Sequence, residues 1–175
     1  IRLYKTFMKK KDPEAANIVM GHNEEDLLGL GTIFSLLAYK KLYDGEYHPK
    51  QCVILEQELK IVIELSAATP VNVSCGNSDF YLSVNGCEAR MLVHLKEGKL
   101  RQYYRNYKDY EFIPGEDTAM PKSITRYMDK SLKIATTPQT CYTWFNCDED
   151  FLNNEKKQMQ YLTHTLPFFL DNLNK

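Results

Sequence analysis

Arginine and tyrosine alternate within one segment of the chain, residues 99–110. Arg101, Tyr103, Arg105 and Tyr107 occupy every second position there. Successive side chains of a β-strand point to opposite faces, so a strand here would place all four on one face. Such a face offers positive charge and flat aromatic surface. These features suit contact with a protein, where Arg and Tyr are favoured, or binding to the phosphates and bases of a nucleic acid.

The net charge of the chain separates these alternatives. The 22 basic and 23 acidic side chains give a net charge of −1 at pH 7, whereas nucleic-acid-binding domains usually carry an excess of basic residues. We therefore interpret the four residues as the partner-binding face of a non-catalytic protein-binding (interaction) domain. A nucleic-acid-binding module that uses the same residues is the alternative function, and an enzyme of unknown type is the third. The interpretation of the four residues that assigns them no binding function is an ordinary solvated sheet face.

Cysteine and histidine supply other reactive groups, five and four of them respectively. Cys75 and Cys147 are the strongest candidate nucleophiles, because a glycine follows the first and a helix start, whose positive end lowers a thiol pKa, follows the second. No catalytic signature surrounds either residue. Unpaired cysteines are among the most buried residues in proteins, so we expect no catalytic residue and no enzymatic activity.

The spacing of the same residues bears on metal binding. Structural zinc sites usually contain two cysteines separated by about two to four residues. The nearest pair here, Cys141 and Cys147, is separated by five residues. We therefore expect neither a metal site nor a cofactor.

The compartment is inferred from the cysteines as well. Their number is odd and their spacing uneven, in a chain large enough to fold without disulfides. We therefore expect reduced thiols and an intracellular protein. Secretion is the alternative, because Asn72-Val73-Ser74 is a glycosylation acceptor sequence. A disulfide between Cys141 and Cys147, or between Cys75 and Cys87, would then be conceivable.

The length of the chain suits one domain. Its 175 residues, 43% of them hydrophobic, predict a single globular domain over residues 1–175. The sequence begins at Ile1 rather than Met, so we expect this domain to be excised from a longer protein. The longest apolar run, residues 27–39, is interrupted by Gly and Thr and is shorter than the roughly 20 residues of a membrane span. No membrane span is expected.

A β-meander is predicted over residues 71–112. Apolar side chains alternate with others at residues 71–75, 80–84 and 91–95, which is typical of half-buried strands. Asn85-Gly86 and Glu97-Gly98 supply residues that adopt positive φ in tight turns. We expect the strands to pair in the order of the chain.

Helices and further strands are predicted around this meander. Asp12 and Pro13 favour a helix over residues 12–20 that stops at Gly21, and a second helix is expected over residues 23–43. Within it, Gly29 and Gly31 would let another backbone approach closely. Two β-branched segments follow and predict strands; the expected ranges are 52–55 and 59–65, and one helix over residues 51–68 is the alternative.

The C-terminal part is expected to hold a polar, mobile loop over residues 113–121, a helix over 123–134 and a strand over 141–145. Asp148 should cap a long amphipathic helix, kinked at Pro167. The predicted class is α+β: an antiparallel β-meander sheet of about five to seven strands, with two N-terminal helices and the long C-terminal amphipathic helix packed on one face.

Overall fold

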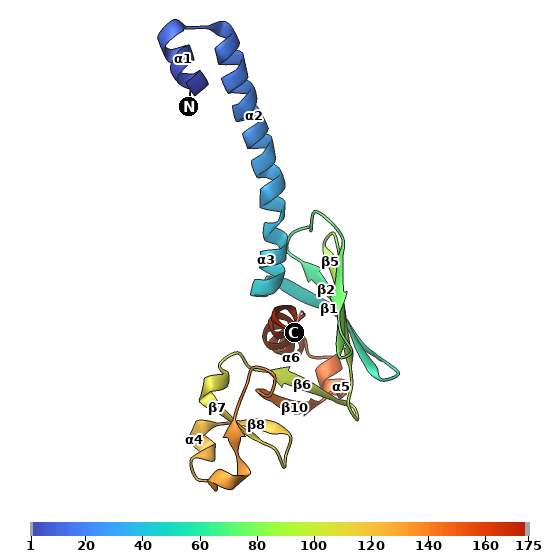
Figure 1. Cartoon of the computed structure of the whole chain (residues 1–175). Coiled ribbons are helices and arrows are strands. Elements are labelled where there is room, and N and C mark those ends of the chain that lie inside the picture. Colours follow the sequence, from blue (N-terminus) through green and yellow to red (C-terminus); the bar gives the residue numbers. More distant parts are fainter. Residues whose placement is uncertain (1, 174–175) are drawn as a thin grey trace.

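The structure is a computed structural model that describes the backbone of residues 2–173, and their side chains except those of residues 2, 3, 6, 7 and 32. It confirms the predicted α+β class. Helices precede a five-stranded antiparallel sheet, and a long helix, α6 (Glu155–Asp171), follows the strands. This helix lies between the five-stranded sheet and a second, smaller sheet (Figure 1).

The main sheet has the strand order β1-β2-β5-β4-β3. Its strands are β1 (Tyr47–Leu55), β2 (Glu58–Leu65), β3 (Val73–Gly76), β4 (Phe80–Asn85) and β5 (Glu88–His94). The prediction that the meander strands pair in the order of the chain is confirmed for β3, β4 and β5. Strand β5 also pairs with β2, which joins the hairpin of β1 and β2 to these three strands. The alternative helix over residues 51–68 is wrong.

Two tight turns shape this sheet. In the β4–β5 hairpin Asn85 pairs with Glu88, so Gly86 and Cys87 form the turn, and only Gly86 has positive φ, at 57°. The predicted pair Asn85-Gly86 is therefore shifted by one residue. The turn at Glu97-Gly98 agrees with the prediction, since φ is 53° and 73° at these two residues.

The remaining strands leave the main sheet. Strand β6 (Lys99–Tyr103) pairs with β10 (Tyr142–Asn146), and β7 (Tyr110–Ile113) lies between β8 (Thr118–Pro121) and β9 (Ile134–Ala135). The predicted loop over residues 113–121 is thus a β-hairpin. The predicted helix over 123–134 is wrong, because it is reduced to the short helix α4 (Lys122–Thr125) and the 3-10 turn Lys130–Leu132.

The C-terminal helical segment packs in the core of the protein. Asp148 caps a short helix, α5 (Glu149–Leu152), by accepting a hydrogen bond from the Phe151 N–H at 2.9 Å. Asn154 then caps α6, so the predicted single helix is divided in two. The buried face of α6 meets the main sheet, where Phe169 stacks on Phe80 with ring centres 4.1 Å apart. The fully buried residues of α6 include Tyr161, Leu162 and Leu166.

The N-terminal helices form an arm. They are α1 (Arg2–Lys10), α2 (Pro13–Ser35) and α3 (Leu37–Asp44), and α2 projects away from the three sheets (Figure 1). Asp12 caps α2 as predicted, by accepting a hydrogen bond from the Glu14 N–H at 3.0 Å. The predicted stop at Gly21 is wrong, since the helix continues to Ser35. Within residues 2–173, no helix combines the length and apolar character needed to cross a membrane.

Candidate binding site at strand β6

The four alternating residues do not share one strand face, which corrects the prediction. Strand β6 ends at Tyr103, and Tyr107 begins a 3-10 turn, Tyr107–Asp109. The chain bends because the Asp109 N–H donates to the Asn106 carbonyl at 2.9 Å and the Asn106 amide donates to the Asp109 carboxylate at 3.1 Å. These hydrogen bonds close a local turn that a straight strand would not permit.

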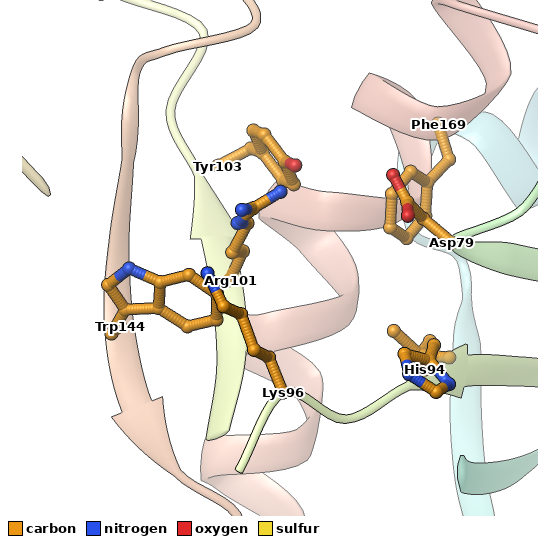
Figure 2. A pocket seen from close by; sticks show the side chains of 8 residues that line it. Asp79, His94, Lys96, Arg101, Tyr103, Trp144 and Phe169 are labelled. Carbon is orange, nitrogen blue, oxygen red and sulfur yellow. The ribbon is translucent and has the colours of Figure 1, made fainter. Parts of the chain in front are cut away.

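Because of this bend, the four side chains line two different pockets. Arg105 and Tyr107 line a shallow pocket of about 370 Å³ beside Tyr43, whose ring centre lies 4.9 Å from the Arg105 guanidinium. Arg101 and Tyr103 line another pocket of about 280 Å³. The latter, called the β6 pocket below, also has walls from other elements (Figure 2); these residues include Asp79, His94, Lys96, Trp144 and Phe169.

Arg101 is the central polar group of the β6 pocket. Its guanidinium packs against two neighbouring rings, 4.7 Å from the ring centre of Tyr142 and 4.7 Å from that of Trp144. The Nε atom is buried without a hydrogen-bond partner. Within residues 2–173, no carboxylate lies at ion-pair distance from this guanidinium. The rings therefore hold a cation whose charge is not matched by a contacting anion.

The two rings are themselves fixed by Asp117, in the turn between β7 and β8. The Trp144 indole N–H donates to the Asp117 carbonyl at 2.8 Å, and the Tyr142 hydroxyl donates to the Asp117 carboxylate. Asp117 has a φ of 49°. Burial, together with this hydrogen bond, raises the pKa of Tyr142 to about 12. The hydroxyl of Tyr142 therefore stays protonated at neutral pH and keeps its role as a donor.

Tyr103 belongs to the core as much as to the pocket. It is 6% exposed and stacks on Phe168 with ring centres 3.7 Å apart. Its edge meets Tyr142 at 5.5 Å. Burial raises the pKa of Tyr103, and the neighbouring Arg101 partly offsets this effect. Tyr103, which was predicted to belong to a binding face, is therefore also part of the core, and its loss would disturb packing.

Charged groups from both sides border the pocket. The Lys96 ammonium lies 5.4 Å from the Trp144 ring centre and 3.9 Å from the Asp117 carboxylate. Asp79 lies across the pocket from Arg101 (Figure 2), in a turn where Asn77 accepts a hydrogen bond from its N–H at 2.9 Å. Cationic and anionic groups therefore both face the cavity.

Sequence reasoning missed several residues of this site. Trp144 reaches Arg101 because the two are opposite each other in the register of β10 and β6. Asp117 lies in the turn of a hairpin that was expected to be a loop. Only Lys96 gave a local signal, since it lies just before β6 in the chain.

The candidate nucleophiles lie elsewhere. Cys147 is buried, and burial raises the pKa of its thiol to about 11. Burial also raises the pKa of Cys75. Both therefore carry protonated, weakly nucleophilic thiols at neutral pH. All five cysteines are free in the structure, and the part of the chain that it describes contains no group of three or more potential metal ligands.

Comparisons with known proteins give no match: no protein-family model, no curated protein and no solved structure is similar to this chain. The β6 pocket must therefore be understood from its own residues.

Proposed function

We propose that this chain is a non-catalytic protein-binding domain, and that the β6 pocket receives an Asp or Glu side chain from an acidic segment of its partner. One observation carries the proposal: the Arg101 guanidinium packs against two rings at the wall of the pocket, and no carboxylate of residues 2–173 lies at ion-pair distance from it. A guanidinium presents a planar array of donors that matches a carboxylate and can bind both of its oxygens.

The packing of Arg101 against two rings supports tight binding for a physical reason. A long side chain usually loses conformational freedom when it engages a partner, and this loss weakens affinity. Trp144 and Tyr142 already restrict the guanidinium, so part of this conformational freedom is lost when the chain folds and not when the partner binds. Tyr, Trp and Arg are also the residue types that contribute most at the centres of protein interfaces.

Nucleic acid is a weaker candidate for the same pocket. Asp79 lines the cavity and Asp117 lies next to Lys96, so a polyphosphate backbone would meet negative charge near Arg101. Arg105, which would have extended a basic track, faces the other pocket.

The test selects random peptides on the immobilised chain and measures the affinity of those enriched. Trp144 is the only tryptophan of the chain, so its fluorescence reports binding at the pocket. We expect enrichment of Asp and Glu. Arg101→Met should weaken binding by about 2 kcal/mol, or roughly 30-fold. Arg126→Met is the matched control, because Arg126 also stacks on a ring, that of Tyr127, but lies outside the pocket.

Two results would contradict the proposal. The first is an enriched set without acidic residues. The second is equal affinity of the Arg101→Met and Arg126→Met variants for an enriched peptide. Binding to single-stranded DNA with a steep salt dependence that Arg101→Met flattens would instead support the nucleic-acid alternative.

A further inference from the structure

Helices α2 and α3 of the N-terminal arm expose an unusual amount of apolar surface. The two helices are nearly continuous, because Leu36 between them keeps helical dihedrals and its N–H donates to the Ile33 carbonyl at 3.0 Å. The large exposed side chains in this part of the arm are Leu27, Leu28, Leu30, Ile33, Phe34, Leu36 and Leu37. None of the three sheets of the same chain covers α2 (Figure 1).

One ordered row of exposed side chains runs along the arm. It consists of Asp26, Leu30, Ile33, Leu37 and Lys40, called the arm stripe below, and all five are exposed. Their spacing alternates between four and three residues, which keeps a row on one face of a helix and is the repeat of helix pairs that pack side by side. The stripe has an apolar centre, an acidic end and a basic end.

This order of charges is self-complementary in one orientation only. Two antiparallel arms that meet near Ile33 bring Asp26 of each copy within reach of Lys40 of the other, with the apolar residues between them. Two parallel arms would instead place Asp26 beside Asp26 and Lys40 beside Lys40. Like charges facing each other across a helix pair destabilise it, so the pattern favours the antiparallel arrangement.

Local contacts leave the stripe available for such pairing. Lys40 pairs with Asp44 of its own helix, but both side chains are exposed and an exposed ion pair of this kind exchanges at little cost. Gly29, four residues before Ile33, borders the stripe. The backbone approach predicted for Gly29 and Gly31 does not occur within the described chain, where nothing lies within 4 Å of a Cβ placed at either residue. A neighbouring helix would therefore find no steric obstacle at these positions.

From these observations we infer that two copies of the chain associate through the arm stripe as an antiparallel, two-fold symmetric pair. The same surface on each copy serves both partners, as in most soluble homodimers. The inference is independent of the function proposed for the β6 pocket.

Sedimentation velocity of the whole chain tests the inference. At about 100 µM we expect a species of twice the mass of the chain. Ile33→Glu should raise the dissociation constant at least about tenfold, because it puts a charge at the centre of the stripe. Leu28→Glu is the matched control: Leu28 is 70% exposed and Ile33 61%, but Leu28 lies on the opposite face of the helix. Circular dichroism verifies that both variants are folded.

Charge reversal tests the orientation. Asp26→Lys and Lys40→Asp should each weaken the dimer, and the double variant should restore it, since opposite charges again face each other in an antiparallel pair. The inference is overturned by a monomeric wild-type chain at this concentration, by equal effects of Ile33→Glu and Leu28→Glu, or by a double variant no tighter than the single ones.

Discussion

The indole N–H of Trp144 donates a hydrogen bond to the backbone carbonyl of Asp117, with a distance of 2.8 Å. This bond joins β10 to the turn between β7 and β8, so it fixes one ring of the β6 pocket by a contact between two different sheets. The orientation of Trp144, and with it the position of Arg101, therefore depends on the β7–β8 hairpin.

Trp144→Phe removes this hydrogen bond and keeps an aromatic ring. We expect the free energy of unfolding to fall by about 1 kcal/mol, the typical contribution of one hydrogen bond. Affinity for an acidic peptide should fall as well, because the ring beside Arg101 is smaller and is no longer fixed to Asp117. Urea denaturation measures the first effect and calorimetric titration the second. Unchanged values of both would show that this contact does not position the pocket.

Gly86→Val tests the hairpin between β4 and β5. Gly86 has a φ of 57°, a conformation that strains a β-branched residue, so the substitution should cost about 1 kcal/mol or more. Gly115→Val is the control, because Gly115 lacks positive φ and a Cβ there would meet open space. Equal urea midpoints for the two variants would contradict the turn geometry.

Leu162→Ala tests the packing of α6. Leu162 is 0% exposed, and removing its side chain should cost on the order of 2 to 5 kcal/mol through lost burial and a new cavity. Leu132→Ala, at a site that is 56% exposed, should change stability by less than about 0.5 kcal/mol. A similar loss at both sites, measured by urea denaturation, would mean that α6 does not pack as described.

Acid stability should depend on Glu111. The pKa of this carboxyl is lowered by its hydrogen bonds to Lys133 and Thr125, the first with a distance of 2.8 Å. A lowered pKa means that the folded state binds fewer protons than the unfolded state. The resulting stabilisation is fully present above the unfolded pKa, about 4.3, and is lost as the pH falls through the folded value.

Urea midpoints between about pH 5 and about pH 3 measure this effect. The wild-type midpoint should fall more steeply than that of Glu111→Gln, which lacks the titrating group. Glu116→Gln, at an exposed carboxylate outside this cluster, should follow the wild type. Parallel slopes for all three chains would rule out a contribution from Glu111.

Alkylation should distinguish the thiols. Cys87 is exposed in the β4–β5 turn, whereas Cys141 and Cys147 are buried and burial raises the pKa of each to about 11. At about pH 7.5, N-ethylmaleimide should modify Cys87 first and reach the two buried thiols only after unfolding. Mass spectrometry of proteolytic fragments identifies the modified residues. Labelling of Cys141 before Cys87 would contradict the packing around β10.

Local signals in the sequence determined much of the secondary structure. The alternation over residues 80–84 and 91–95 predicted β4 and β5, because side chains of a strand alternate between faces whatever the strand pairs with. Asp12 caps α2 as predicted, and Asp148 is also a helix cap, although of the short α5 and not of the long helix. Each cap is a hydrogen bond to a backbone N–H only two or three residues away. Such features require no knowledge of the rest of the chain.

The tertiary structure alone decided which strands are neighbours and where the site lies. The sequence pointed to Arg101 and Tyr103, but Arg105 and Tyr107 separate from them because β6 ends at Tyr103. Trp144 and Asp117 join Arg101 through pairings between distant segments. Local alternation fixes the direction of each side chain, whereas the choice of strand partners depends on how the whole chain buries its apolar surface, to which every segment contributes.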